Sequence, residues 1–450
     1  MTEGNVDLLV LGGGMAGLAA AARTVQAGGS AVLVEKGDAV GGSATYAEFI
    51  WTAPDLETLR ERNPNGDPAL AEAFIAGFEP AVQWVRDFGV EVQEPVDLLN
   101  FGRGYQTDLS NLFLLERRLI EDGGGSELLL GAEPLRLLIG DGDVVEGAEV
   151  RLASGATREI RATTTLLAMG GFAANRELRA RHLGEQAAAM PLRANPHSAG
   201  RGLELAEAAG AAFGPENAGF YGHLWASGVP VADPLNFAEM TFYHSEHGVL
   251  LNVEGERFLD ETVGDQLNAI ALLDQPQARC LLVYDEFVHR EWMMKPYVQG
   301  VEPFDKFDAV YKAGGSRCAI AHELGEFAEL PEEWGYPAEK VHAALVEFNR
   351  RAAADESFDP PRTVDARPLD EPPYYVVEVI PAITFTMGGI RIDSEARALD
   401  VNGEPVTGLL AAGGDAGGLY HRAYAGGLAA ALVFGLQAAE TARARAGTPA

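Results

Sequence analysis

The chain opens with an apolar run, a glycine-rich turn and an Ala-rich segment. The run Val6 to Leu11 has the pattern of a buried strand, the turn spans Gly12 to Gly17, and the residues up to Ala22 have the composition of a helix. A second apolar run, Ala31 to Val34, follows and ends at Glu35. This order predicts a complete strand–helix–strand unit.

The next 130 residues change from a helical to a strand-like pattern. Between about Asp67 and Leu119, apolar residues recur three and four positions apart, which predicts helices that flank the sheet. From Glu127 to Thr165, short alternating runs beginning with Leu128 to Leu130 are separated by Gly-Asp-Gly and Ser-Gly turns. They predict a β-meander, after which Leu166 to Phe172 returns the chain to the core.

The middle of the chain has a different character from both ends. From about Gly214 to Arg362 aromatic residues increase, histidines are scattered and the predicted helices are short. Strands resume from Val376, and Leu409 to Gly414 resembles a core strand that leads into a Gly-rich turn and a last Ala-rich helix. We therefore expect an α/β fold whose first domain is discontinuous, residues 1–214 and 363–450, with an inserted α+β domain at residues 215–362.

Composition excludes several classes of protein. The 450 residues include 34 basic and 66 acidic ones, a net charge of −32, so a nucleic-acid partner is not expected. The two cysteines, Cys280 and Cys318, lie far apart in sequence and without metal-ligand spacing. This excludes a disulfide framework, an iron–sulfur cluster and a zinc ribbon.

No segment has the pattern of a leader or a membrane span. The first apolar run is six residues long, with no basic region before it and no small-residue cleavage site after it. The weakly polar stretch Ala423 to Ala439 is interrupted by several glycines and Gln437, and it is too short for a bilayer span of about 20 residues. We predict a cytoplasmic protein without a transmembrane helix.

The opening turn has the spacing of a dinucleotide-binding motif. In Gly12-x-Gly14-x-x-Gly17, the glycines allow a tight turn, close approach of a pyrophosphate and close packing of the following helix. The helix N-terminus then faces the phosphates. Glu35, at the end of the next strand, is placed to accept hydrogen bonds from ribose hydroxyls.

Further glycine-rich segments favour FAD over a nicotinamide dinucleotide. Gly41-Gly42-Ser43 adds a second phosphate contact, and the segments 165–172 and 408–415 look like those that close the FAD site in flavoproteins of the glutathione-reductase type. A second Gly-x-Gly-x-x-Gly is absent from the sequence, so an NAD(P)H domain is not expected. We expect a Rossmann-like FAD-binding domain with an inserted capping domain for substrate. The residues expected to bind FAD are Gly12, Gly14, Met15, Ala16, Gly17, Glu35, Lys36, Gly41, Gly42, Ser43, Pro134, Ala168, Gly170, Gly171, Gly414, Asp415, Gly427 and Leu428.

Over nearly its whole length the chain resembles the fumarate reductase/succinate dehydrogenase flavoprotein superfamily, in the soluble branch that includes 3-ketosteroid dehydrogenases. Besides the N-terminal motif, the matching segments are 168–175 (AMGGFAAN), 200–210 (GRGLELAEAAG), 248–261 (GVLLNVEGERFLDE), 374–393 and 408–435. The resemblance implies that the inserted region caps the flavin and that substrate lies between the cap and the isoalloxazine ring.

Three positions depart from the pattern for dicarboxylate substrates. Fumarate reductases carry histidine before Thr-Met-Gly-Gly, where this chain has Thr384-Phe385, and a substrate-binding arginine where this chain has Tyr424. Their acid arginine aligns with His289, beside Arg290. Without these cations a dicarboxylate would be desolvated and poorly paired, so a less charged substrate is favoured.

The segment from His421 to Gly427 resembles the Tyr-then-Gly motif of ketosteroid dehydrogenases, and also that of tricarballylate-dehydrogenase-like proteins. In the former, the tyrosine and a backbone N–H polarise the substrate ketone. By this resemblance Tyr424 is the first catalytic candidate, with the N–H of Gly427 or Leu428 as its partner. A core tyrosine packed under the last helix is the alternative.

Proton transfer requires a second group. A tyrosine performs it when a cation or another phenol stabilises its phenolate, and the candidates are Tyr243 and Tyr105. The weaker candidates are the cap histidines His289, His244, His247 and His223. Arg257 and Glu261 match a family motif and form either a structural ion pair or part of the chemistry. His244 and His247 lack a third ligand at a recognisable spacing, so no metal site is expected.

The sequence therefore predicts an FAD-dependent oxidoreductase acting on a carbon–carbon bond next to a carbonyl, with an apolar cyclic ketone such as a 3-ketosteroid as substrate. Gly42 to Thr52 contains no histidine, so FAD is expected to be non-covalent. The alternatives are an enzyme for a small carboxylic acid, with Arg422, Arg257 or Arg290 as the clamp, and a flavin-binding protein without turnover. The partners are a small-molecule substrate and an unidentified electron acceptor or donor.

Overall fold

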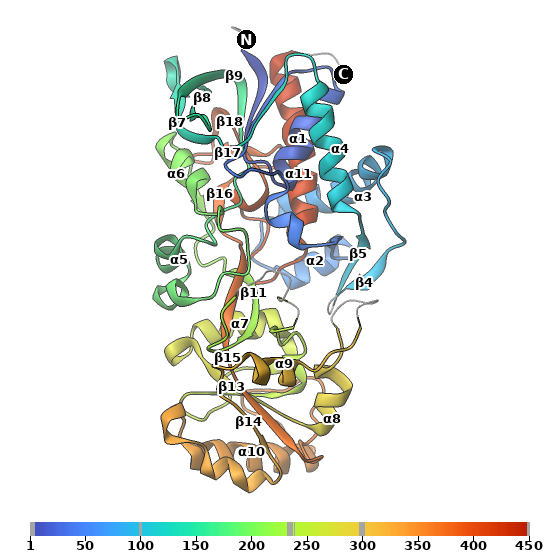
Figure 1. The fold of residues 1–450 in the computed structure, drawn as a ribbon, viewed down its shortest axis with the longest axis vertical. Helices are drawn as coiled ribbons and strands as arrows, with labels where there is room; N and C mark the ends of the chain where they lie inside the picture. Colours follow the sequence, from blue (N-terminus) through green and yellow to red (C-terminus); the bar gives the residue numbers. More distant parts are fainter. Residues whose placement is uncertain (1–4, 99–100, 232–236, 238, 297–301, 448–450) are drawn as a thin grey trace. The chain divides into compact units, whose positions relative to one another are not determined.

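A computed structural model describes residues 5–98, 101–231, 237, 239–296 and 302–447, coloured along the sequence in Figure 1. They form two compact units. Unit 1 comprises Met1–Leu183, Ala194–Phe220 and Phe385–Ala450, and unit 2 comprises Gly184–Arg193 and Tyr221–Thr384. These limits differ from the expected boundaries after residues 214 and 362, because most of the strand Tyr374–Thr386 belongs with unit 2. The division into domains stays a prediction.

Unit 1 is built on an eight-stranded sheet whose central strands are parallel. The order is β17-β18-β9-β1-β2-β6, and β7 and β8 extend it from β9. The bounds are β1 (Val6–Leu11), β2 (Ala31–Val34), β6 (Glu127–Leu129), β7 (Glu133–Ile139), β8 (Val145–Arg151), β9 (Thr157–Leu167), β17 (Arg397–Leu399) and β18 (Pro405–Ala411). The α/β class expected from the sequence is confirmed.

The register of the parallel strands places the glycine-rich turns at one edge of the sheet. Leu11 at the end of β1 pairs with Val34 of β2 and with Leu167 of β9, and Leu167 pairs with Ala411 of β18. The turns that follow these strands therefore begin at the same level.

The predicted meander is partly wrong. β6, which covers most of the run Leu128 to Leu130, pairs in parallel with β2 instead of joining the antiparallel strands β7 and β8. β9 is one 11-residue strand that spans both a predicted meander strand and the following core run. A short apolar run carries no information on its partner, and Ala162 and Thr164 continue the alternation of buried positions between the two predicted pieces.

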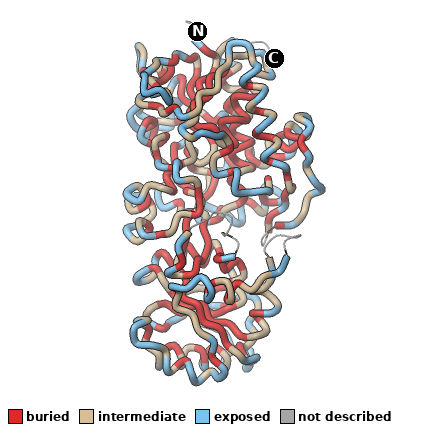
Figure 2. The backbone as a smooth tube through the Cα atoms, in the orientation of Figure 1, coloured by how far each residue is buried: buried red, intermediate tan, exposed pale blue. Residues whose placement is uncertain are grey.

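Helices cover this sheet, as the buried segments in Figure 2 indicate. α1 and α11 pack against each other closely, because a Cβ at Gly435 would lie 2.5 Å from the carbonyl oxygen of Ala16. α1 also packs against α4, and α3 packs against α11. The helices of unit 1 are α1 (Met15–Gln26), α2 (Leu56–Arg62), α3 (Pro68–Asp87), α4 (Leu109–Asp122), α5 (Arg176–Leu183), α6 (Arg201–Ala208) and α11 (Gly427–Ala446).

Two small sheets complete unit 1. One has the order β3-β5-β4, with β3 at Phe49–Thr52, β4 at Val96–Leu98 and β5 at Gly102–Gln106. The other has the order β10-β16-β19, with β10 at Phe213–Gly214, β16 at Gly389–Arg391 and β19 at Ala416–Gly417.

Unit 2 contains a second sheet of five strands. Its order is β11-β15-β13-β12, and β14 also pairs with β15. The strands are β11 (Phe220–Ala226), β12 (Val249–Asn252), β13 (Cys280–Asp285), β14 (Cys318–Ala321) and β15 (Tyr374–Thr386), and the helices are α7 (Asp265–Leu273), α8 (Glu286–Val288), α9 (Lys306–Ala313) and α10 (Ala338–Ala353). β13 is buried along its whole length, so it forms the centre of this sheet. Among the described residues, no helix combines the length and apolarity needed to cross a membrane.

Candidate active site

The first glycine turn of unit 1 leaves no space for side chains at two positions. Gly12 has φ of 111°, and a Cβ there would lie 2.2 Å from the carbonyl oxygen of Ala168. A Cβ on Gly17 would lie 1.9 Å from the carbonyl oxygen of Gly12. Both clashes are with backbone, so side-chain rotation cannot relieve them, and the turn requires glycine at both positions.

The two glycine loops meet in front of helix α1. The N–H of Gly41 donates to the carbonyl oxygen of Gly13 at 2.7 Å, and Gly14 and Gly41 form a parallel bridge. A Cβ on Gly14 would meet only the carbonyl oxygen of Gly41, at 4.0 Å. Gly14 is also the N-cap of α1, and no side chain caps this end of the helix. The helix N-terminus thus presents N–H groups beside an open backbone position, which suits a phosphate group.

Glu35 holds the turns that surround this position. One carboxylate oxygen accepts the N–H of Gly13 at 2.7 Å, and the other accepts the N–H of Gly37 at 2.7 Å. Its neighbour Lys36 points away and forms an ion pair with Glu133 at 3.0 Å. Glu35 lies at the end of β2 as predicted, and a carboxylate in this place is able to bind a ribose hydroxyl.

Two further predicted cofactor residues have partners within unit 1. The hydroxyl oxygen of Ser43 accepts the N–H of Asn195 at 3.3 Å. The carbonyl oxygen of Pro134, at the start of β7, accepts from the Nε of Arg201 at 3.3 Å. Ser43 thus lies in the 3-10 helix Gly42–Tyr46 and Pro134 in strand β7, and each is hydrogen-bonded to another segment of unit 1.

Asp415 links the loops that follow β9 and β18. Its buried carboxylate accepts the N–H of Met169 at 2.5 Å and that of Gly171 at 3.0 Å. Burial raises the pKa of Asp415 to about 6, and the two N–H donors oppose this shift. A Cβ on Gly414 would lie 2.8 Å from Gly170, so these loops also require glycine.

These features fit FAD, which carries a pyrophosphate, a ribose, a ribityl chain and two flat ring systems, adenine and isoalloxazine. The open position at Gly14 and the uncapped α1 suit the pyrophosphate, and Glu35 suits a ribose. The buried hydroxyl of Thr386 lies near the Cβ position of Gly171 and has no hydrogen-bond partner in the described part of the chain. An unpaired buried hydroxyl at this edge is explained by a polar atom of a bound cofactor.

Tyr424 lies among aromatic rings of unit 1. Its ring centroid is 5.6 Å from that of Trp51, 5.8 Å from Phe385 and 5.6 Å from Tyr420. An apolar hollow in the same unit is lined by Phe385, Met387, Leu419 and Tyr420. Aromatic faces of this kind contact flat apolar molecules favourably.

The hydroxyl of Tyr424 lies at the N-terminus of α11. Its oxygen accepts the N–H of Gly427 at 2.6 Å, and Gly426, with φ of 95°, is the N-cap of the helix. Burial raises the pKa of Tyr424 to about 12, so the group stays a phenol at neutral pH. Gly427 is thus bound to Tyr424 itself, and the N–H of Leu428 is the predicted second donor that follows it in the first turn of α11.

Tyr105, on β5, is bound to an acid. Its hydroxyl donates to the carboxylate of Glu79, at 2.8 and 2.9 Å, and its ring lies under the guanidinium of Arg86. Burial and Glu79 raise the pKa of Tyr105, and Arg86 opposes this shift without reversing it. The net shift disfavours the phenolate of Tyr105.

Tyr243, in unit 2, lies beside a buried cation. Its hydroxyl is 3.2 Å from an Nη of Arg193. The other Nη donates to the hydroxyl of Thr384 at 3.2 Å. Tyr243 and Arg193 are 8% and 4% exposed, so the contact is formed away from bulk solvent. Tyr243 has the cationic neighbour that a proton-transferring tyrosine requires.

His223 also packs against Tyr243. The ring centroids are 4.7 Å apart in an edge-to-face arrangement. The Nδ1 of His223 is hydrogen-bonded to the carboxylate of Asp265, which also accepts the N–H of Leu224 at 3.0 Å. Burial lowers the pKa of His223, opposed by Asp265 and assisted by the charge of Arg193.

His289, at the C-cap of α8, is enclosed by tyrosines. Its ring stacks on Tyr375, with centroids 4.2 Å apart, and its Nε2 is 3.2 Å from a carboxylate oxygen of Asp305. Its buried Nδ1 has no hydrogen-bond partner among the described residues. His289 is therefore held in the interior of unit 2.

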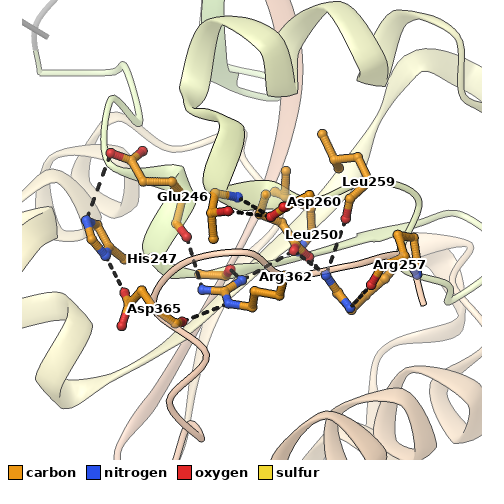
Figure 3. A network of polar contacts seen from close by, with 12 residues as sticks. Glu246, His247, Leu250, Arg257, Leu259, Asp260, Arg362 and Asp365 are labelled. Atoms are coloured by element: carbon orange, nitrogen blue, oxygen red, sulfur yellow. Dashed lines mark hydrogen bonds and ion pairs between the residues drawn. The ribbon is translucent and has the colours of Figure 1, made fainter. Parts of the chain in front are cut away.

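Arg257 and Glu261 form an ion pair at 2.6 Å. Glu261 is fully buried and also pairs with Arg362 at 3.3 Å, while Arg257 donates to the carbonyl oxygen of Leu259 (Figure 3). Arg362 bonds three further backbone carbonyl oxygens, of Glu246, Gly248 and Asp365. These partners join the loops around residues 246–261 and 362–365, which is a structural role.

The histidines beside this network are also engaged. Figure 3 shows His247 between Asp365, 2.5 Å from its Nδ1, and Glu246, 3.9 Å from its Nε2. His247 stacks on Trp292 with centroids 3.7 Å apart, and His244 lies 6.5 Å from His247 by ring centroid. Within the described residues, no group of three or more His, Cys, Asp or Glu side chains has the arrangement of a metal site.

Sequence reasoning did not identify four of these residues, namely Trp51, Arg193, Asp265 and Thr386. Trp51, Arg193 and Asp265 each contact a partner more than 40 positions away, so no local motif marks them, whereas Thr386 is the first residue of the Thr-Met-Gly-Gly motif. For Arg193, the apolar surroundings Met190, Pro191 and Leu192 provide a weak signal, because a charged residue in such a run needs a reason.

The sequence of this chain is similar to a known protein family and to individual reductases. Residues 7–428 match the protein family described as FAD binding domain. Among related sequences, the fumarate reductase (cytochrome) of Shewanella frigidimarina is 24% identical over 97% of this chain and 77% of its own length. The vinyl phenol reductase of Lactiplantibacillus plantarum is 25% identical over 92% of this chain and 90% of its own length.

Solved structures share the fold. The 3-ketosteroid delta1-dehydrogenase from Sterolibacterium denitrificans superposes with a TM-score of 0.77, at 19% identity, over 98% of this chain and 99% of that one. At this identity the likeness shows the arrangement of the chain and leaves the substrate undetermined.

Proposed function

Because the chain belongs to the FAD binding domain family, within the fumarate reductase/succinate dehydrogenase flavoprotein superfamily, we propose that it adds or removes hydrogen across a carbon–carbon bond next to a carbonyl of an apolar cyclic ketone, such as a 3-ketosteroid. Its class is an FAD-dependent oxidoreductase acting on CH–CH groups. The resemblance inferred from the sequence motifs is confirmed at this level, and the substrate is the proposal.

Unit 1 holds the cofactor in this proposal. The glycine loops at Gly14 and Gly41 hold the pyrophosphate, Glu35 a ribose, and the loops joined by Asp415 the part near Thr386. When bound, FAD supplies hydride transfer to or from the substrate carbon. The protein's own groups bind the carbonyl and move the proton.

The observation that carries the proposal is that Tyr424 is a phenol whose oxygen accepts the N–H of Gly427. Its pKa of about 12 keeps it a phenol, and a phenol whose oxygen accepts the Gly427 N–H donates a stronger hydrogen bond through its own hydrogen. Such a donor stabilises the negative charge that develops on a ketone oxygen when an adjacent C–H is lost. The rings of Trp51, Phe385 and Tyr420 provide apolar surroundings for a cyclic substrate.

The proton requires a group other than Tyr424, and Tyr243 is the better candidate. Tyr243 has Arg193 as a neighbour, whereas Tyr105 donates to the carboxylate of Glu79, which disfavours its phenolate. His289 has its Nε2 against Asp305 and is stacked on Tyr375, so it is the weaker choice.

The test of the proposal is Tyr424→Phe. We expect flavin reduction by a 3-ketosteroid in single-turnover experiments to slow by about tenfold to a thousandfold, because one hydrogen bond to the developing oxyanion is lost. The flavin content should be unchanged. A rate equal to that of the wild type would remove Tyr424 from the mechanism.

The second candidate is an enzyme for a small carboxylic acid, which the name of the relative fumarate reductase supports. Arg257 is already paired with the buried Glu261, and Arg290 pairs with Glu291 at the surface. The third clamp expected for this alternative is Arg422, whose backbone N–H donates to the carbonyl oxygen of Ala218 at 2.6 Å. A panel of 3-ketosteroids, vinylphenol, urocanate, tricarballylate and fumarate separates the candidates by which compound changes the flavin spectrum.

Three further points belong to the proposal. FAD is bound non-covalently, so acid precipitation should release all flavin into the supernatant, and flavin in the pellet would contradict this.

The electron acceptor or donor is a separate molecule, and the protein is cytoplasmic. A protein without turnover would leave the flavin spectrum unchanged with every compound of the panel.

A further inference from the structure

Arg193 is a buried arginine whose position is fixed by its backbone. It is 4% exposed. Its N–H donates to the carbonyl oxygen of Ile383 at 2.7 Å, and the N–H of Ile383 donates to Pro191 at 2.9 Å. The segment is thereby joined to strand β15 within unit 2, and the guanidinium lies next to Thr384 of the same strand.

The partners of this guanidinium are all neutral. They include the hydroxyls of Thr384 and Tyr243, both at 3.2 Å, and the carbonyl oxygen of Phe237 at 3.5 Å. The guanidinium carbon also lies 4.8 Å from the ring centroid of Phe237 and 6.0 Å from that of Trp225. In the described part of the chain, Arg193 forms no ion pair with a carboxylate, and its buried Nε has no hydrogen-bond partner. Burying a charge without a counter-ion costs free energy, so an anion is expected beside this guanidinium at some stage of the reaction.

The anion in this neighbourhood is engaged elsewhere. Asp265 is bonded to His223 and to the N–H of Leu224. Among the described residues, the titratable and charged groups around Tyr243 include Arg193, His223 with Asp265, and Tyr221, whose ring packs on His223 at 4.8 Å. Among these groups, Tyr243 is the one whose ionised form would contact Arg193 directly.

We propose that Arg193 is a positioning residue that stabilises the phenolate of Tyr243, so that the Tyr243–Arg193 pair is the proton acceptor of the reaction. The inference rests on the proposed function for the reaction it serves, and on the 3.2 Å contact for its geometry. In water a phenolate at neutral pH is rare, and a buried guanidinium in contact with it supplies the stabilisation.

The protons and electrons balance with FAD as the oxidant. In the dehydrogenation direction, the phenolate oxygen of Tyr243 would take the proton from the carbon next to the carbonyl, and a carbon–carbon double bond would form as the next carbon loses a hydride. FAD, when bound, would supply the two-electron oxidant that accepts this hydride. In the reduction direction, the phenol of Tyr243 returns the proton to carbon. The charge on Arg193 is paired in one state of the cycle and unpaired in the other.

The first test compares the pH dependence of single-turnover flavin reduction in the holoenzyme. We expect Arg193→Gln to move the rising limb of the profile to higher pH by about one unit or more, because phenolate formation loses its cation. Arg193→Lys, which keeps the charge, should restore most of the shift. Asp265→Asn removes the nearby negative charge and should move the limb in the opposite direction.

The second test does not depend on turnover. Ultraviolet difference spectra during a pH titration report tyrosinate directly. We expect a tyrosinate signal that appears at lower pH in the wild type than in Arg193→Gln, and that is absent from Tyr243→Phe. If no ketone of the panel reduces the flavin but this signal is present, the proposed function fails and the pair stands.

Two results would overturn the inference. One is an unchanged pH profile and tyrosinate signal in Arg193→Gln that still folds and binds flavin. The other is a higher KM for acidic substrates alone, which would make Arg193 a substrate clamp. If Arg193→Gln does not fold, the tyrosinate signal of the wild type and its loss in Tyr243→Phe still test the ionisation of Tyr243, and a signal that is equal in the two would overturn the inference.

Discussion

The candidate cofactor site of unit 1 is made mainly of backbone atoms, whereas the candidate site of unit 2 is made of side chains. In unit 1, glycines at 12, 17, 41 and 414 allow the loops to approach each other. The carboxylate of Asp415 accepts the backbone N–H groups of Met169 and Gly171. In unit 2 the cluster consists of side chains, with Arg193, Tyr243 and Thr384 in contact across many residues of sequence. A site made of closely packed backbone does not tolerate larger residues in place of glycine. A site made of side chains tolerates substitutions, and its proton affinities change with the charge of the residues.

This difference separates what each unit does. Rigid loops suit an invariant cofactor, because their geometry cannot adapt to another ligand. A cluster of charged and phenolic groups can be tuned in proton affinity by single substitutions. Substitutions in the glycine loops of unit 1 should therefore change cofactor content, and substitutions in the side-chain clusters of unit 2 should change stability or pH dependence while FAD stays bound.

The largest expected effect is in unit 1. Gly17→Ala places a methyl group 1.9 Å from the carbonyl oxygen of Gly12, and neither backbone can move without opening the turn. We expect the purified variant to hold less than about a tenth of the wild-type flavin. The ratio of flavin to protein absorbance measures it. Gly124→Ala is the control, because a Cβ there meets nothing within 4 Å, and equal loss in both variants would contradict the explanation.

The next effect is in unit 2 and concerns stability. Glu378, 1% exposed, accepts from Arg279 at 2.5 Å, from Arg317 at 2.7 Å and from the hydroxyl of Tyr336 at 2.9 Å. Glu378→Ala leaves these donors without their acceptor, so the free energy of unfolding should fall by about 3–5 kcal/mol. Denaturant titration followed by circular dichroism measures it.

The matched control for Glu378 is another glutamate with two arginine partners. Glu347 pairs with Arg350 and Arg351, each at 2.7 Å, but at the surface. Glu347→Ala should change the free energy of unfolding by less than about 1 kcal/mol. A similar loss in both variants would show that burial is not what gives Glu378 its effect. Flavin content should stay normal in both.

The third effect tests Asp415 through pH. Its pKa in the folded chain is about 6, above the ordinary 3.8, so folding favours the protonated acid. Its contribution to stability is then fully present below about pH 4 and is lost as pH rises through 6, by roughly 3 kcal/mol. Unfolding free energies of the wild type and Asp415→Asn between pH 4 and 7 should diverge by this amount, the wild type falling more steeply. Parallel curves would contradict it.

The smallest effect is a gain. Glu116 on α4 is fully buried, and neither carboxylate oxygen has a hydrogen-bond partner among the described residues. Burial raises its pKa well above the ordinary range. Glu116→Leu should raise the free energy of unfolding at neutral pH by about 1–3 kcal/mol, because an unsatisfied polar group is replaced by an apolar one. Glu121→Leu, exposed on the same helix, is the control, and an equal gain there would reject the explanation.

The sequence predicted the part of the molecule that depends on local geometry. Gly12, Gly14 and Gly17 are close in sequence, and the turn they form depends on their own φ and ψ angles, so spacing alone indicates it. The second glycine loop was predicted from its own Gly-Gly-Ser sequence after Glu35, and the segments after β9 and β18 were predicted because each directly follows a predicted strand. The partner of β6 could not, since pairing depends on chain topology.

The side-chain contacts of unit 2 depend on sequence separations that no motif encodes. Tyr243 was identified as a candidate, but its neighbour Arg193 lies 50 positions earlier and His223 lies 20 positions earlier. The environment of Tyr105 also appeared only with the fold, because Glu79 comes from α3 and Tyr105 from β5. In both cases, the surroundings that set proton affinity are tertiary.

The chain passes between the units four times, after Leu183, Arg193, Phe220 and Thr384. No single truncation point can yield either unit intact, and a ribosome must translate at least as far as Phe385 before the nucleotide-binding half can begin to acquire its last strands and its terminal helix. Expression of either unit alone therefore requires its separate segments to be joined.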